Sequence, residues 1–107
     1  MMDHILTGVE ELVEQEHKAI VTKHGDGYNS AHEAYAVLLE EVQEAEEALS
    51  YVKCQLDNLW DYIRRDDDKL IGTNVLRTEH YAKQLAAEAV QVAAVCRRAR
   101  GGYNHDA

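Results

Sequence analysis

Residues 30–64 read SAHEAYAVLLEEVQEAEEALSYVKCQLDNLWDYIR, and this stretch decides the fold class. Its apolar residues recur every three or four positions as Ala34, Leu38, Val42, Ala45, Leu49, Val52, Leu56, Leu59 and Ile63. This spacing places them on one face of an α-helix. Ser30 followed by Glu33 forms a capping box, so we expect the helix to begin there and to end near Arg64. The pattern leaves open whether it is a single rod or two helices with a kink near Ser50.

The segments on either side predict further helices. Apolar spacing over residues 3–22 favours a first helix, which ends in a turn at residues 23–29 that contains two glycines. Three consecutive acidic residues, Asp66–Asp68, are poor helix formers and predict the end of the second helix. We expect a connector through Gly72 and a last helix over residues 75–100, with Thr73 or Asn74 as the N-cap of that helix.

No segment shows strand alternation, so the sequence predicts an all-α helical bundle of three to four helices. We expect a single domain over residues 1–100, followed by a flexible C-terminal tail at residues 101–107. The apolar stripes are too long for one small bundle to cover. We therefore predict that the fold is completed by oligomerisation, as a homodimer or homotetramer.

Composition narrows the functional class. The chain has 107 residues, no Pro or Phe, and a formal net charge of −9. Such an acidic protein is not expected to bind a nucleic acid polymer or an anionic membrane. Cys54 and Cys96 lack metal-ligand spacing, and no signal peptide opens the chain, so we expect reduced thiols in a cytoplasmic protein. No apolar run is long enough to cross a bilayer.

Glu88 is the most informative residue of the last helix, because it falls within the apolar stripe. At about 100° per residue it lies among Tyr81, Leu85, Val92 and Val95. An ionised carboxylate in that position loses hydration, and no Lys or Arg lies one turn away to compensate. We therefore expect a positively charged partner from elsewhere in the structure.

A second acidic cluster on the middle helix suggests that this partner is a metal ion. Glu40, Glu41 and Glu44 follow one another closely, and Glu41 and Glu44 are neighbours on the helix surface. A hard divalent cation would turn their repulsion into attraction, and Mg²⁺ prefers a few carboxylates with water and phosphate oxygens. The alternative is a solvated acidic face, which is the commoner role of such a run.

The two acidic motifs together resemble MazG-type all-α nucleotide pyrophosphohydrolases. Residues 32–45, HEAYAVLLEEVQEA, are similar to the family's first metal-binding helix with its EExxE motif. Residues 88–95, EAVQVAAV, are similar to the second motif, ExxD, in the variant found in phage-type MazG-like proteins. The resemblance covers roughly residues 19–99, and it implies a MazG-like fold and Mg²⁺-dependent hydrolysis of a nucleoside triphosphate to a monophosphate and pyrophosphate.

The resemblance also implies roles for individual residues. Glu41, Glu44 and Glu88 are expected to act as the catalytic metal ligands, with Glu40 as an additional ligand or support and Gln91 orienting a water. The substrate would contact residues of the first turn and the start of the second helix: Lys23, His24, Asn29 and His32. For the first three, an ordinary turn or surface role is the simpler interpretation.

Two features keep a second interpretation open. Gln91 occupies the position of the family's Asp, which removes one negative charge and predicts weaker metal binding and attenuated activity. The stretch between Glu44 and Glu88 is longer than usual, which predicts an extended second helix or an extra one. The alternative is a non-catalytic helical interaction protein of phage origin that keeps the MazG-like fold. The cluster of Arg97, Arg98 and Arg100 is explained by the helix dipole alone.

Overall fold

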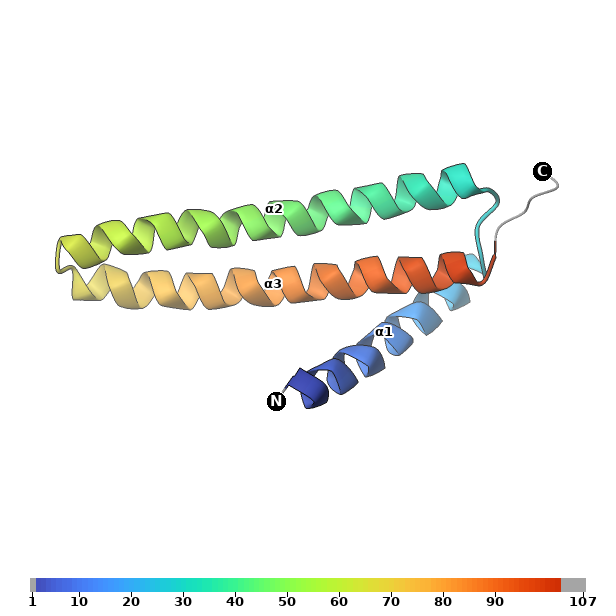
Figure 1. Ribbon diagram of the computed structural model, residues 1–107, viewed down its shortest axis with the longest axis horizontal. Coiled ribbons are helices and arrows are strands. Elements are labelled where there is room, and N and C mark those ends of the chain that lie inside the picture. The colour runs from blue at the N-terminus through green and yellow to red at the C-terminus, as the bar shows by residue number, and fades with distance from the viewer. Residues whose placement is uncertain (1, 103–107) are drawn as a thin grey trace. The chain divides into compact units, whose positions relative to one another are not determined.

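The computed structural model describes residues 2–102, which form three α-helices: α1 (Met2–His24), α2 (Ala31–Arg64) and α3 (Asp68–Arg100) (Figure 1). No β-strand occurs within these residues, so the all-α prediction is confirmed. None of the described helices combines the length and apolar character needed to cross a membrane. Of the expected tail at residues 101–107, residues 103–107 lie outside the described part of the chain, and the Gly102 carbonyl accepts a 3.0 Å hydrogen bond from the Tyr28 N–H.

The turn between α1 and α2 follows the prediction. Gly25 and Gly27 have φ angles of 85° and 67°, which residues with a side chain rarely adopt. The hydroxyl of Ser30 then accepts a hydrogen bond of 3.1 Å from the Glu33 backbone N–H. This N-cap begins α2 where the capping box predicted it.

The connection between α2 and α3 corrects one prediction. α2 itself runs without interruption from Ala31 to Arg64, which is the single helix that the sequence had left open beside a division near Ser50. α3 begins at Asp68, whereas we expected a connector through Gly72 with Thr73 or Asn74 as the cap. The physical reason is that the Asp67 carboxylate accepts a 3.1 Å hydrogen bond from the Leu70 N–H and caps the helix earlier. Asp66, with a φ of 53°, makes the turn.

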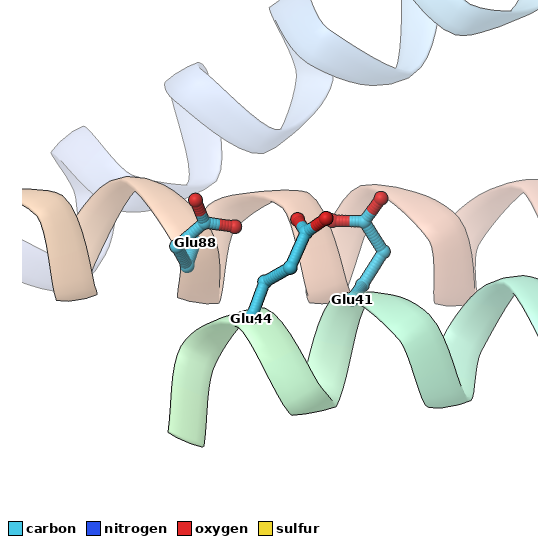
Figure 2. A group of neighbouring side chains, drawn as sticks. All are labelled: Glu41, Glu44 and Glu88. Atoms are coloured by element: carbon cyan, nitrogen blue, oxygen red, sulfur yellow. The ribbon is translucent and has the colours of Figure 1, made fainter. Parts of the chain in front are cut away.

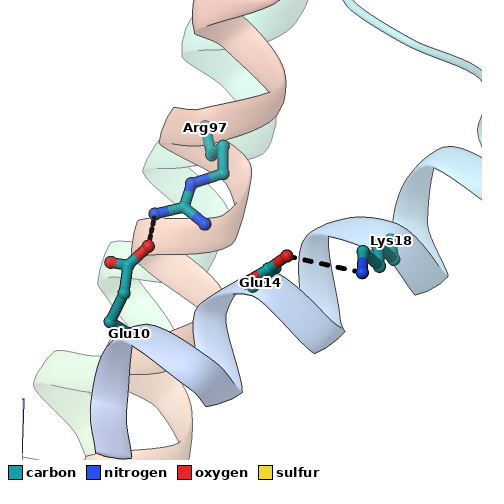
Figure 3. A network of polar contacts seen from close by, with 4 residues as sticks. All are labelled: Glu10, Glu14, Lys18 and Arg97. Atoms are coloured by element: carbon teal, nitrogen blue, oxygen red, sulfur yellow. Dashed lines mark hydrogen bonds and ion pairs between the residues drawn. The ribbon is translucent and has the colours of Figure 1, made fainter. Parts of the chain in front are cut away.

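The described residues divide into two compact units, which share the long helices α2 and α3. Unit 1 contains residues 2–42 and 89–102, and its core includes Tyr28, Ala34 and Val95, against which Val37, Leu38 and Ala99 pack. An ion pair between Glu10 on α1 and Arg97 on α3 also lies in this unit, near the Glu14–Lys18 pair within α1 (Figure 3). Unit 1 therefore holds the main hydrophobic core.

Unit 2, Gln43–Glu88, is a hairpin formed by the second part of α2 and the first part of α3. Only Ala48 and Asn74 are buried in it. The Asn74 side chain, 2% exposed, donates hydrogen bonds to the backbone carbonyl and the side-chain oxygen of Gln55. Large apolar residues remain exposed, among them Trp60 at 61%, because two helices provide no third layer to cover them. The long spacing between Glu44 and Glu88 is explained by this extended hairpin.

Candidate metal centre

The centre consists of three carboxylates. Glu44 on α2 and Glu88 on α3 belong to the hairpin of unit 2, and Glu41 precedes Glu44 by three residues on the same uninterrupted helix. One carboxylate oxygen from each residue lies within 4.8 Å of the other two, and Figure 2 shows the three side chains converging. The structure thus brings together the three residues that were predicted from two separate motifs.

Charge repulsion and burial act on Glu88 in particular. Its side chain is half-buried, and burial, followed by the negative charge of Glu44 and a hydrogen bond with that residue, raises the pKa of Glu88. No Lys or Arg offsets the repulsion between Glu44 and Glu88 through an ion pair. The ion pairs among residues 2–102 involve other acidic residues: Glu10, Glu14, Asp61 and Glu79. The pair of Glu44 and Glu88 therefore favours a bound proton or a bound cation.

The donor set fits a hard divalent cation. Ligand oxygens about 2.1 Å from Mg²⁺ are separated from one another by roughly 3–4.2 Å in an octahedral shell. Oxygens that lie within 4.8 Å of each other reach this arrangement through small side-chain movements. Glu44 is exposed, so water can supply the remaining ligands. Exposed acidic groups also gather without an ion, and carboxylates alone do not distinguish Mg²⁺ from other hard cations.

The other two predicted ligands lie differently. Glu40 is exposed and does not belong to the group of three converging carboxylates. Gln91 is half-buried and lines a pocket in unit 1, together with Glu41. Glu41 is therefore common to the carboxylate group and to this pocket.

The pocket in unit 1 has a volume of about 550 Å³. Its lining consists of Ile20, His24, Tyr28, Asn29, Glu33, Val37, Glu41, Gln91, Val95 and Arg98. Of the predicted substrate contacts, His24 and Asn29 line it, whereas Lys23 and His32 are exposed and do not. The Asn29 side-chain amide donates a 3.0 Å hydrogen bond to the Glu33 carboxylate. A pocket of this size accommodates a small organic molecule.

Among the pocket residues that sequence reasoning missed are Tyr28 and Arg98, which contact each other. Tyr28 is only 6% exposed, and the guanidinium carbon of Arg98 lies 4.1 Å from the centre of its ring. Arg98 also donates a 3.3 Å hydrogen bond to the backbone carbonyl of His24. The interpretation of Arg98 through the helix dipole alone was incomplete. No local signal could have found the pair, because 70 positions separate the two residues.

Unit 2 holds a smaller pocket of about 240 Å³ beside the Glu44–Glu88 pair. It is lined by Glu44, Glu47, Ala48, Tyr51, Gln84 and Glu88. The Tyr51 hydroxyl donates a 2.8 Å hydrogen bond to Glu47, and this bond and the charge of Glu47 raise the pKa of Tyr51. The ring centroids of Tyr51 and Tyr81 lie 5.2 Å apart. The lining adds a fourth carboxylate, that of Glu47, and one aromatic ring, that of Tyr51.

No protein-family model, curated protein or solved structure matches this chain.

Proposed function

We propose that the chain is a Mg²⁺-dependent nucleoside triphosphate pyrophosphohydrolase with a MazG-like fold. The observation that carries this proposal is the approach of Glu41, Glu44 and Glu88 to within 4.8 Å of one another. These are the positions at which the resemblance to the family puts its metal ligands. The raised pKa of Glu88 supports the proposal further, because a carboxylate that is costly to ionise gains most from a cation.

In the proposed reaction, water adds across the α–β phosphoanhydride, and the products are a nucleoside monophosphate and pyrophosphate. Mg²⁺ would be held by Glu41, Glu44 and Glu88, and would neutralise phosphate charge and acidify the attacking water. Gln91, in the pocket that contains Glu41, offers a carbonyl oxygen in place of the family's carboxylate. His24 and Asn29 line the same pocket and would contact the nucleotide.

We also propose that copies of the chain associate as a homodimer or homotetramer through unit 2. The support is its set of exposed large apolar residues: Leu49, Tyr51, Leu56, Trp60, Ile63, Leu70, Val75 and Leu76. Such a surface is typical of helices that complete their core with a second chain. Light scattering should give a multiple of 12.1 kDa, and the mass of a single chain would contradict the proposal. The free thiols of Cys54 and Cys96 suit the proposed cytoplasmic location.

The test of the activity is a panel of canonical and modified nucleoside triphosphates, assayed for pyrophosphate release with Mg²⁺. Glu44→Ala should abolish release while leaving the helix content unchanged by circular dichroism. Glu46→Ala, which removes an exposed carboxylate two residues away on α2, should retain it and is the matched control. Equal turnover by both variants would remove Glu44 from the site.

The second candidate function is a non-catalytic interaction protein of phage origin that keeps the MazG-like fold. It is favoured by Gln91 at the family's Asp position and by the exposed apolar surface of unit 2. A thermal melt separates the two candidates. A hydrolase should gain stability by mass action when nucleotide and Mg²⁺ are added together, whereas an interaction protein should gain none.

A further inference from the structure

The pocket of unit 1 contains a cationic group that is held in place by an aromatic ring. The Arg98 guanidinium carbon lies 4.1 Å from the ring centre of Tyr28, which is 94% buried and belongs to the core of this unit. Stacking on a buried ring fixes the plane of the guanidinium. Both residues line the pocket, so the oriented cation is part of its wall.

Two polar atoms of this pair are not satisfied by the protein. The Tyr28 hydroxyl and Arg98 Nε are buried and have no hydrogen-bond partner among residues 2–102. Both atoms have almost no accessible surface, so a ligand in the pocket would meet the Nη groups of Arg98 and not these two atoms. The Nη groups of a guanidinium can only donate hydrogen bonds, so a ligand that meets them must offer acceptor atoms.

The neighbouring arginine shows that Arg98 is not simply a helix-end charge. Arg97 forms an ion pair with Glu10 of α1, as Figure 3 shows. The hydrogen bond that Arg98 donates goes instead to the neutral carbonyl oxygen of His24, at a distance of 3.3 Å. No carboxylate neutralises Arg98 through an ion pair among residues 2–102, and a guanidinium of this kind is suited to bind phosphate.

We propose that Arg98, positioned by Tyr28, binds a phosphate group of the substrate's polyphosphate chain. This inference rests on the proposed function, because the Glu41 of the carboxylate group lines the same pocket. Two acidic residues, Glu33 and Glu41, also line the pocket and repel an anion. A cation held by Glu41 in the same pocket would offset this repulsion, so we expect phosphate binding to depend on both Mg²⁺ and Arg98.

The test uses isothermal titration calorimetry of the full chain with inorganic pyrophosphate in the presence of Mg²⁺. Arg98→Gln should weaken pyrophosphate binding at least tenfold, and Arg98→Lys, which keeps the charge but loses the fork, should weaken it several-fold. Arg100→Gln removes an exposed arginine two residues away and should bind within twofold of wild type. Equal affinities of the Arg98→Gln and Arg100→Gln variants would overturn the proposal.

A purely structural role of Arg98 would give a different result. Circular dichroism and thermal unfolding report whether Arg98→Gln remains folded. If Arg98→Gln unfolds, the folded variant Arg98→Lys decides the question. Wild-type affinity in Arg98→Lys would overturn the proposal, and a several-fold loss would support it.

Further titrations distinguish a nucleotide from a free phosphate ligand. An α,β-imido deoxynucleoside triphosphate, which resists hydrolysis, should bind more tightly than pyrophosphate, and both should depend on Arg98. The unphosphorylated deoxynucleoside should bind equally to wild type and Arg98→Gln. Arg98-dependent pyrophosphate binding without any turnover would refute the hydrolase and keep the anion site. Turnover with no effect of Arg98→Gln on pyrophosphate binding or KM would support the hydrolase and refute the anion site at Arg98.

Discussion

Glu44 on α2 and Glu88 on α3 direct their carboxyl groups to within 4.8 Å of each other, and burial and the charge of Glu44 together raise the pKa of Glu88. Two carboxylates held in this way make the hairpin less stable when both are ionised. The same arrangement is suited to a divalent cation. Its energetic consequences can be measured without any assumption about the substrate.

The first prediction concerns pH and Glu88. Because the folded state holds the proton more tightly than the unfolded state, stability without divalent ions should fall as pH rises above the ordinary Glu value of 4.5. Glu88→Gln should therefore melt about 1–2 °C above wild type at pH 7, for a repulsion of a few tenths of a kcal/mol. The difference should vanish below pH 4, where Glu88 is protonated in both states. Glu46→Gln should show no such gain, and an equal gain would mean that general charge reduction is the cause.

The second prediction concerns Gln91. Gln91→Asp restores the carboxylate of the family motif, and it should tighten Mg²⁺ binding several-fold in a calorimetric titration, because a charged oxygen binds a hard cation better than an amide. Gln43→Asp adds the same charge at an exposed position of α2 and should change Mg²⁺ affinity little. An unchanged titration for Gln91→Asp would place this side chain away from the cation.

The third prediction concerns the turn before α2. A Cβ at Gly27 would collide with the carbonyl of Gly102, which also accepts a 3.0 Å hydrogen bond from the Tyr28 N–H. Gly27→Ala should thus cost about 3 kcal/mol of unfolding free energy, from the collision and the positive φ together. Gly25→Ala has the positive φ but open space around it, and should cost only about 1 kcal/mol. Urea denaturation measures both, and equal losses would contradict the predicted contact.

The fourth prediction concerns the buried amide of unit 2. Asn74→Ala removes both hydrogen bonds to Gln55 and should lower the free energy of unfolding by about 1–3 kcal/mol in urea denaturation. Asn58→Ala, at an exposed position of α2, should change it by less than about 0.5 kcal/mol. A similar small effect at Asn74 would show that its hydrogen bonds contribute nothing net to the hairpin.

Helix content and the limits of α2 were predictable, because they depend on interactions between residues three or four positions apart. Ser30 and Glu33 define the start of α2, and the acidic run at Asp66–Asp68 marks its end. The start of α3 was missed, although the Asp67 cap is also local, because Gly72 was taken as a helix breaker. Gly72 lies inside the helix with open space around it.

The sequence by itself determined the all-α composition and the position of Glu88 on an apolar helix face, since helical periodicity is a local property. Only the tertiary structure decided that Glu88 meets Glu44, and that Arg98 stacks on Tyr28 in a pocket wall. These pairs are 44 and 70 positions apart. Their contact depends on how distant segments pack, and residue spacing along one helix carries no information about that.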